Sequence, residues 1–182
     1  DDARRQGAAI FSVLRTQPFM RPFNWQRGTS LYDGIFHWRD LSAMPVAERL
    51  AKMRDAQFRE QLRWGFDHPN TDGSKGSTLP PPPLHTVFVD VSAADPSAVG
   101  RSLAQLAKER HVHAADIMCE LAVADGLATQ FLWNTESPVW AEANADAQRN
   151  PHMIIGTGDG GAHADRDDGA EWSTYYIRSW LL

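Results

Sequence analysis

The residues most able to do chemistry lie in one glycine-rich segment near the end of the chain. Residues 156–169 have the sequence GTGDGGAHADRDDG and follow an apolar run at 153–155. Glycines let the backbone turn sharply and approach a ligand closely, and Asp159 stands among them with His163 just beyond. Because barrel and open-sheet α/β enzymes place catalytic groups at the carboxyl ends of buried strands, Asp159 is the first candidate for a catalytic carboxylate.

Three other interpretations fit parts of this segment. The spacing of Gly156, Gly158 and Gly161 matches the dinucleotide-binding fingerprint, but the acidic residues around it would repel a pyrophosphate. A calcium-binding EF-hand that starts at Asp165 would need an acidic ligand at its twelfth position, where Tyr176 stands. An acidic surface turn without chemical function remains open.

Two further groups have the residue types of metal-binding or reactive sites. His111 and His113 form an H-x-H pair, which would clamp a metal on a strand because residues two apart share a face. The pair lies between two predicted helices, so we expect His113 to cap the second helix instead. Cys119 lies in an apolar helical stretch, which predicts a buried and inert thiol. A single cysteine excludes an internal disulfide and any cysteine-rich zinc module.

In the first part of the chain, regular elements alternate with irregular stretches. The apolar run 8–15 predicts a buried strand. Residues 19–40 are dense in aromatics and arginine without a sustained period, which indicates an ordered loop, either packed by its own aromatic side chains or lining a substrate pocket. Residues 45–65 predict a surface helix broken near Asp55. Residues 67–83 end in four prolines and predict an exposed loop.

From residue 85 on, helices and short strands alternate, which favours an α/β layout. The expected elements are a strand at 85–91, helices at 102–111, 114–125 and 137–148, a short buried strand at 153–155, and a helix over 173–182 that Ser173 caps. The glycine-rich segment therefore connects the last predicted strand to the last predicted helix.

Composition and charge exclude several classes of function. Hydrophobic residues make up 42% of the 182 residues and charged residues 23%, which is ordinary for a globular protein. No apolar run approaches the roughly 20 residues that span a bilayer, and the beginning DDARRQGAAI is not a signal peptide, so we expect a cytoplasmic protein without membrane contact. A net charge of −5 without clustered basic residues argues against nucleic-acid binding. The missing initiator Met and the apolar last residues predict an excerpt from a longer protein.

The string at residues 156–163 resembles the G-x-S-D-[AG]-G-A-H motif of N-acyl-D-amino-acid deacylases, the D-aminoacylases of the metal-dependent amidohydrolase superfamily. Residues 85–182 resemble that family in the order of their segments, and residues 1–66 do so only loosely. The flanking matches are at residues 99–103, 114–117, 150–156, 173–175 and 179–180. Gly158 departs from the motif, which often has serine there, but the aspartate remains.

The resemblance implies a (β/α)8 TIM-type barrel, of which this chain would be the C-terminal part. Residues 1–18 would hold a late barrel strand, residues 19–84 a loop and helical insertion, and residues 85–182 the last barrel segments with the catalytic loop 156–169. A typical barrel needs about 250 residues, so this chain cannot contain all of it.

The implied activity is hydrolysis of an amide C–N bond in an N-acyl-D-amino acid, a small-molecule substrate. Asp159 would act as general base and proton shuttle and would also touch the metal, as it does in relatives. His163 would order the loop or approach the substrate. Arg15, at the end of the expected seventh strand, would bind the substrate carboxylate. Zinc is the implied cofactor, held mainly by residues outside this chain. The oligomeric state remains open.

A function of a different class also fits the residues. A non-catalytic α/β module, or a degenerate amidohydrolase without metal ligands, could bind a partner through the aromatic residues 19–40 and the proline-rich residues 67–83. The two hypotheses differ in what they predict upstream of this segment in the full reading frame. Histidines from early barrel strands would support the amidohydrolase.

Overall fold

The chain is a mixed α/β protein in two compact units. The computed structural model describes residues 2–69, 81–156 and 171–182. The first unit consists of Asp1–Arg21 with Asn134–Leu182, and the second unit consists of Pro22–Trp133. Among the described residues, no helix combines the length and the apolar character needed to cross a membrane.

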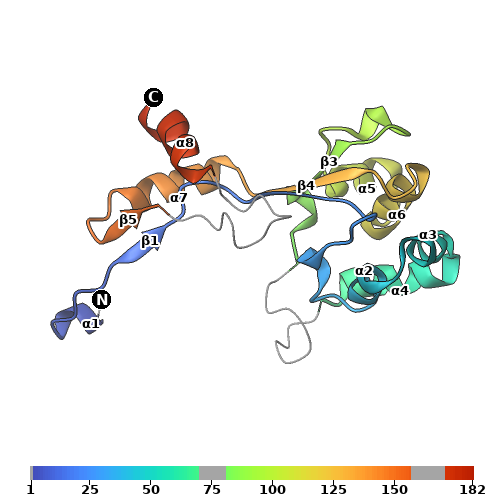
Figure 1. Ribbon diagram of the computed structural model, residues 1–182, viewed down its shortest axis with the longest axis horizontal. Coiled ribbons are helices and arrows are strands. Elements are labelled where there is room, and N and C mark those ends of the chain that lie inside the picture. Colours follow the sequence, from blue (N-terminus) through green and yellow to red (C-terminus); the bar gives the residue numbers. More distant parts are fainter. Residues whose placement is uncertain (1, 70–80, 157–170) are drawn as a thin grey trace. The chain divides into compact units, whose positions relative to one another are not determined.

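The first unit is built around two parallel strands (Figure 1). Its elements in chain order are α1 (Asp2–Arg5), β1 (Ser12–Leu14), α7 (Pro138–Gln148), β5 (Met153–Ile155), α8 (Trp172–Tyr176) and a π-helical turn (Ile177–Leu181). β1 pairs with β5 in parallel, with Val13 opposite Ile154 and Leu14 opposite Ile155. Parallel pairing between segments so far apart in sequence gives both strands a common carboxyl edge.

These two strands were predicted to be buried, and that expectation is wrong, because each of their residues is exposed or half-buried. The side chains of Val13 and Ile154 are 58% and 53% exposed, and Phe11 beside them is also exposed. In the described part of the chain this sheet has two strands. An apolar strand is buried only where further strands or helices cover both of its faces, as parallel sheets normally require.

The second unit combines a cluster of helices with a three-stranded sheet. Its elements are β2 (Met20–Phe23), a 3-10 turn (Ser30–Tyr32), α2 (Trp38–Ala43), α3 (Val46–Arg54), α4 (Ala56–Asp67), a 3-10 turn (Leu84–Thr86), β3 (Val87–Val91), a 3-10 turn (Pro96–Ala98), α5 (Leu103–Arg110), α6 (Ala114–Ala124) and β4 (Gln130–Asn134). The strand order is β2-β4-β3, and β3 and β4 are antiparallel. The predicted break at Asp55 is confirmed, since its carboxylate accepts a hydrogen bond from Phe58 N at 2.8 Å and starts α4.

Capping side chains begin four of the described helices, α4 to α7. Ser102 and Gln105 form a capping box at the start of α5, and Ser137 caps α7 with a proline in its first turn, as the sequence predicts. The last helix differs from its prediction. It begins at Trp172 and passes into the π-helical turn, so Ser173 lies inside the helix and does not cap it.

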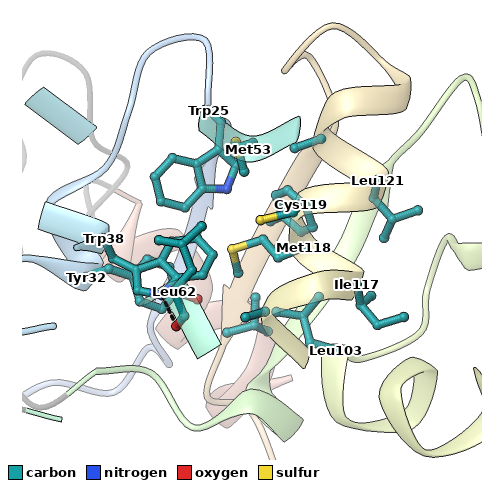
Figure 2. Packing of buried hydrophobic residues seen from close by; sticks show 14 of the residues in the cluster. Trp25, Tyr32, Trp38, Met53, Leu62, Leu103, Ile117, Met118, Cys119 and Leu121 are labelled. Atoms are coloured by element: carbon teal, nitrogen blue, oxygen red, sulfur yellow. Dashed lines mark hydrogen bonds between the residues drawn. The ribbon is translucent and has the colours of Figure 1, made fainter. Parts of the chain in front are cut away.

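Helix α6 is the centre of the core of the second unit. Its buried residues form a broad apolar face, whereas Glu120 on the opposite side is exposed. Figure 2 shows Met118 and Cys119 of α6 directed toward Trp25, Tyr32 and Trp38. The same core contains Val87 of β3. The second unit therefore runs on past residue 84, where the sequence-based division had placed the end of the insertion, to Trp133.

The aromatic residues between positions 19 and 40 pack against one another. Trp25 and Trp38 are fully buried, their ring centroids lie 5.2 Å apart, and Trp38 stacks on Phe66 at 4.5 Å. The prediction of a stretch packed by its own aromatics is confirmed, although it also contains the regular elements β2 and α2. Phe36 remains partly exposed.

Within this core, Trp38 and Tyr32 differ in whether the polar atom of the side chain is hydrogen-bonded. The indole Nε1 of Trp38 donates to Leu62 O at 2.9 Å, whereas the hydroxyl of Tyr32 is buried without a hydrogen-bond partner among the described residues, and burial raises the pKa of Tyr32. An unpaired buried hydroxyl costs about 1–3 kcal/mol. We therefore expect Tyr32→Phe to raise the free energy of unfolding by about 1 kcal/mol. Chemical denaturation measures this change.

Trp38→Phe is the matched control for the Tyr32 variant. It removes a satisfied hydrogen bond and core volume, so the free energy of unfolding should fall by about 2–3 kcal/mol. A Tyr32→Phe protein less stable than the unsubstituted one would contradict an unpaired hydroxyl at this position.

Candidate functional site

The candidate site lies at the common carboxyl edge of β1 and β5. Because the strands are parallel and paired Leu14 to Ile155, the residues that follow them, Arg15 and Gly156, leave the sheet at the same edge. Gly156 N donates to Leu14 O at 3.2 Å, which continues the pairing by one residue. In open α/β sheets and barrels, ligands bind at this edge.

Arg15 is held by its surroundings on both its side chain and its backbone. Its Nε donates to Gln17 O at 3.1 Å, and its guanidinium carbon lies 4.0 Å from the centroid of the Phe19 ring. The backbone oxygen of Arg15 accepts a hydrogen bond from Asn144 Nδ2 of α7 at 2.8 Å. A half-buried guanidinium fixed in this way is preorganised, which suits a residue that binds a planar carboxylate.

Glycine is required where the chain leaves β5. Gly156 has φ +123°, and a Cβ atom on it would lie 2.7 Å from the ring of Trp172. Side-chain-bearing residues rarely adopt this conformation, and the ring leaves no space for one. Trp172 of α8 therefore packs against the first residue of the glycine-rich segment.

Two buried polar residues follow Arg15. Trp180 Nε1 donates to the backbone oxygen of Thr16 at 2.9 Å, and Gln17 Nε2 donates to Glu171 Oε1 at 2.5 Å. Thr16 and Gln17 are 1% and 3% exposed. The segment after β1 is thus joined to the helical segment after the glycine-rich stretch by side-chain hydrogen bonds.

Of the three residues that the sequence singles out for the site, the structure describes Arg15. Asp159 and His163 lie outside the described residues, as do the rest of 157–170 and positions 70–80 of the proline-rich stretch. Their predicted roles stay predictions.

The two histidines of the H-x-H pair have separate structural roles. His111 closes α5 in the left-handed conformation. His113 begins α6, where its Nδ1 accepts from Ala115 N at 3.1 Å and its Nε2 lies 3.2 Å from Asp67 Oδ1. The prediction that His113 caps this helix is confirmed. Within residues 2–69, 81–156 and 171–182, no group of three or more His, Cys, Asp or Glu side chains could hold a metal ion.

Cys119 is inert, as predicted. Its thiol is buried in the core of the second unit, and burial raises the pKa of Cys119 to about 12. A neutral, inaccessible thiol is neither a nucleophile nor a metal ligand at neutral pH.

Sequence reasoning did not single out Gln17, Asn144, Glu171 or Trp172. The contacts that bring them to the carboxyl edge join positions far apart, and Gln17 and Glu171 are 154 positions apart. A local signal nevertheless exists at one end: two polar residues, Thr16 and Gln17, directly follow an apolar strand and an arginine, the position where α/β proteins place ligand-binding groups.

Comparisons of the chain with family models, with curated proteins and with solved structures gave no match.

Proposed function

We propose that this chain is the C-terminal part of a zinc-dependent amidohydrolase that hydrolyses the amide C–N bond of N-acyl-D-amino acids. The proposal is carried by one observation: the string Gly156–His163, which resembles the D-aminoacylase motif, directly follows β5. The parallel pairing of β1 with β5 supports it, because the seventh and eighth strands of a (β/α)8 barrel are parallel neighbours.

The second unit has a natural place in such a barrel. The chain leaves the first unit after β1, forms the second unit, and returns to the first unit before α7 and β5. The second unit would therefore be an insertion between two consecutive barrel strands. Its own buried core, centred on α6, explains how a long insertion can be stable between two strands.

The residues of this chain would divide the work at the carboxyl edge of the pair. Arg15 would bind the substrate carboxylate through its guanidinium, which Phe19 and the backbone of Gln17 hold in place. Asp159 would take a proton from the attacking water and deliver it to the leaving amine. His163 would order the glycine-rich segment or approach the substrate.

Zinc enters the proposal from the resemblance alone. The described residues do not themselves form a metal site. The ligands of the zinc ion would be Asp159 and, for the most part, residues outside this chain. A bound zinc ion supplies Lewis-acid chemistry, which polarises a carbonyl group.

Hydrolysis of a panel of N-acyl-D- and N-acyl-L-amino acids by the full-length protein tests the proposal. We expect turnover of the D-series, lost after treatment with a chelator and restored by zinc. The methyl esters of the same N-acyl-D-amino acids test the proposed role of Arg15 in binding the substrate carboxylate. A substrate without a carboxylate should be turned over poorly. Absence of turnover on the whole panel, in a preparation that retains bound zinc, would contradict the proposed substrate class.

A further inference from the structure

Residues 171–180, which contain α8 and the residues on both sides of it, contact the segments after β1 and β5 at three points. Gln17 binds Glu171, the residue directly before α8, at 2.5 Å. The ring of Trp172 packs against Gly156. Trp180, in the π-helical turn that continues α8, donates to the backbone oxygen of Thr16 at 2.9 Å. Of these contacts, the one between Gln17 and Glu171 joins two side chains, one of them a carboxylate.

Gln17 is oriented by the chemistry of its partner. A carboxylate accepts hydrogen bonds and donates none, so the amide nitrogen must be the atom that faces Glu171. Hydrogen bonds to an ionised acceptor are shorter and about twice as strong as neutral ones. The backbone oxygen of Gln17 accepts from Arg15 Nε at 3.1 Å. One buried residue therefore contacts both the arginine after β1 and the carboxylate before α8.

We propose that Gln17 is a positioning residue of the candidate site, an inference that rests on the proposed function. Its hydrogen bond to Glu171 fixes the start of α8 against the carboxyl edge of the strand pair. Because Arg15 Nε donates to the backbone oxygen of Gln17, a Gln17 that is fixed by Glu171 also holds the guanidinium of Arg15 in place. Gln17 then controls the rate of reaction without touching the substrate.

A swap of the two side chains tests this role. Gln17→Glu places two carboxylates in contact, which repel, and misplacement by about 1 Å lowers turnover about 100-fold. Glu171→Gln keeps an amide-to-amide hydrogen bond and should lower kcat/KM by less than about 10-fold. The double variant restores an amide–carboxylate pair in the reverse sense. It should recover at least about 10-fold of the loss in the single Gln17→Glu variant.

The control is Gln61→Glu, which adds the same charge at an exposed position of α4 in the second unit. It should leave kcat and KM unchanged. A second readout, hydrogen exchange of the α8 amides, does not depend on activity: Gln17→Glu should lower their protection, and the double variant should restore it.

The outcomes separate this inference from the proposed function. Unchanged hydrogen exchange in Gln17→Glu would overturn the fixing of α8, whether or not the protein is an amidohydrolase. Restored hydrogen exchange with unrestored turnover in the double variant would overturn a positioning role and indicate that Gln17 itself touches the substrate. An unsubstituted protein without turnover contradicts the proposed function and with it the kinetic part of this inference, while hydrogen exchange still decides the structural part.

Discussion

Arg49→Met is expected to lower the free energy of unfolding by about 3–5 kcal/mol, the usual cost of breaking a buried charged network. Arg49 of α3 is 4% exposed, and burial lowers the pKa of its guanidinium. Its nitrogens donate to five backbone oxygens, those of Trp25, Gln26, Leu41, Ser42 and Met44. Within the described residues no carboxylate pairs with it. Methionine fills similar space but leaves these carbonyls without their donors.

The large effect follows from what Arg49 connects. The five oxygens come from the segment after β2 and from the end of α2, and the guanidinium holds both against α3. Arg49→Lys should also lose stability, by about 2 kcal/mol, because an ammonium with three donors cannot reach five acceptors. Urea denaturation measures both losses.

Arg54→Met is the control for this prediction. Arg54 lies on the same helix and is exposed, so its replacement should change the free energy of unfolding by less than about 0.5 kcal/mol. Equal losses for the two arginines would show that the backbone network of Arg49 does not stabilise the fold.

On the proposed function, Asp159→Asn in the full-length protein is expected to lower kcat/KM for an N-acyl-D-amino acid about 100- to 10,000-fold, the range that general acid–base catalysis contributes. Asparagine keeps the size of the side chain but cannot accept the proton of the attacking water. Steady-state kinetics at saturating zinc measure the loss, and metal analysis of the same sample shows whether zinc is retained.

Asp146→Asn provides the matched comparison for Asp159. Asp146 of α7 is exposed and pairs with Arg149 on the surface, and such pairs contribute about 0–1 kcal/mol. Its variant should keep normal turnover. Near-normal turnover of Asp159→Asn would contradict the role of Asp159 as general base, which is the main implication of the resemblance at residues 156–163.

Several helix starts could be predicted from the sequence because their signals are local. Ser102 reaches a backbone group three positions away, and so does Ser137, so a short stretch of sequence contains everything that the cap requires. The break at Asp55 is of the same kind. The mixed α/β character followed from these local elements.

Features that depend on distant partners could not be predicted in this way. The burial of Val13 depends on what lies beside β1, which residues 12–14 do not encode. The extent of the second unit depends on the core that α6 shares with Trp25 and Trp38, from which the proline-rich stretch separates it in sequence. At the candidate site, the sequence indicated Arg15 as the residue after a strand, but the contact between Gln17 and Glu171 has no local pattern.

The strand arrangement has a consequence for how this protein can change. β2 and β4, through which the chain enters and leaves the second unit, are neighbours in one sheet. At their outer ends Thr135 N donates to Phe19 O at 2.9 Å, and Phe19 N donates to Thr135 Oγ1 at 2.9 Å. The chain thus enters and leaves the second unit at adjacent positions, and a tight hairpin would connect the same two positions, Phe19 and Thr135. A segment attached in this manner can be lost, exchanged or enlarged over evolution while the paired strands β1 and β5 keep their register.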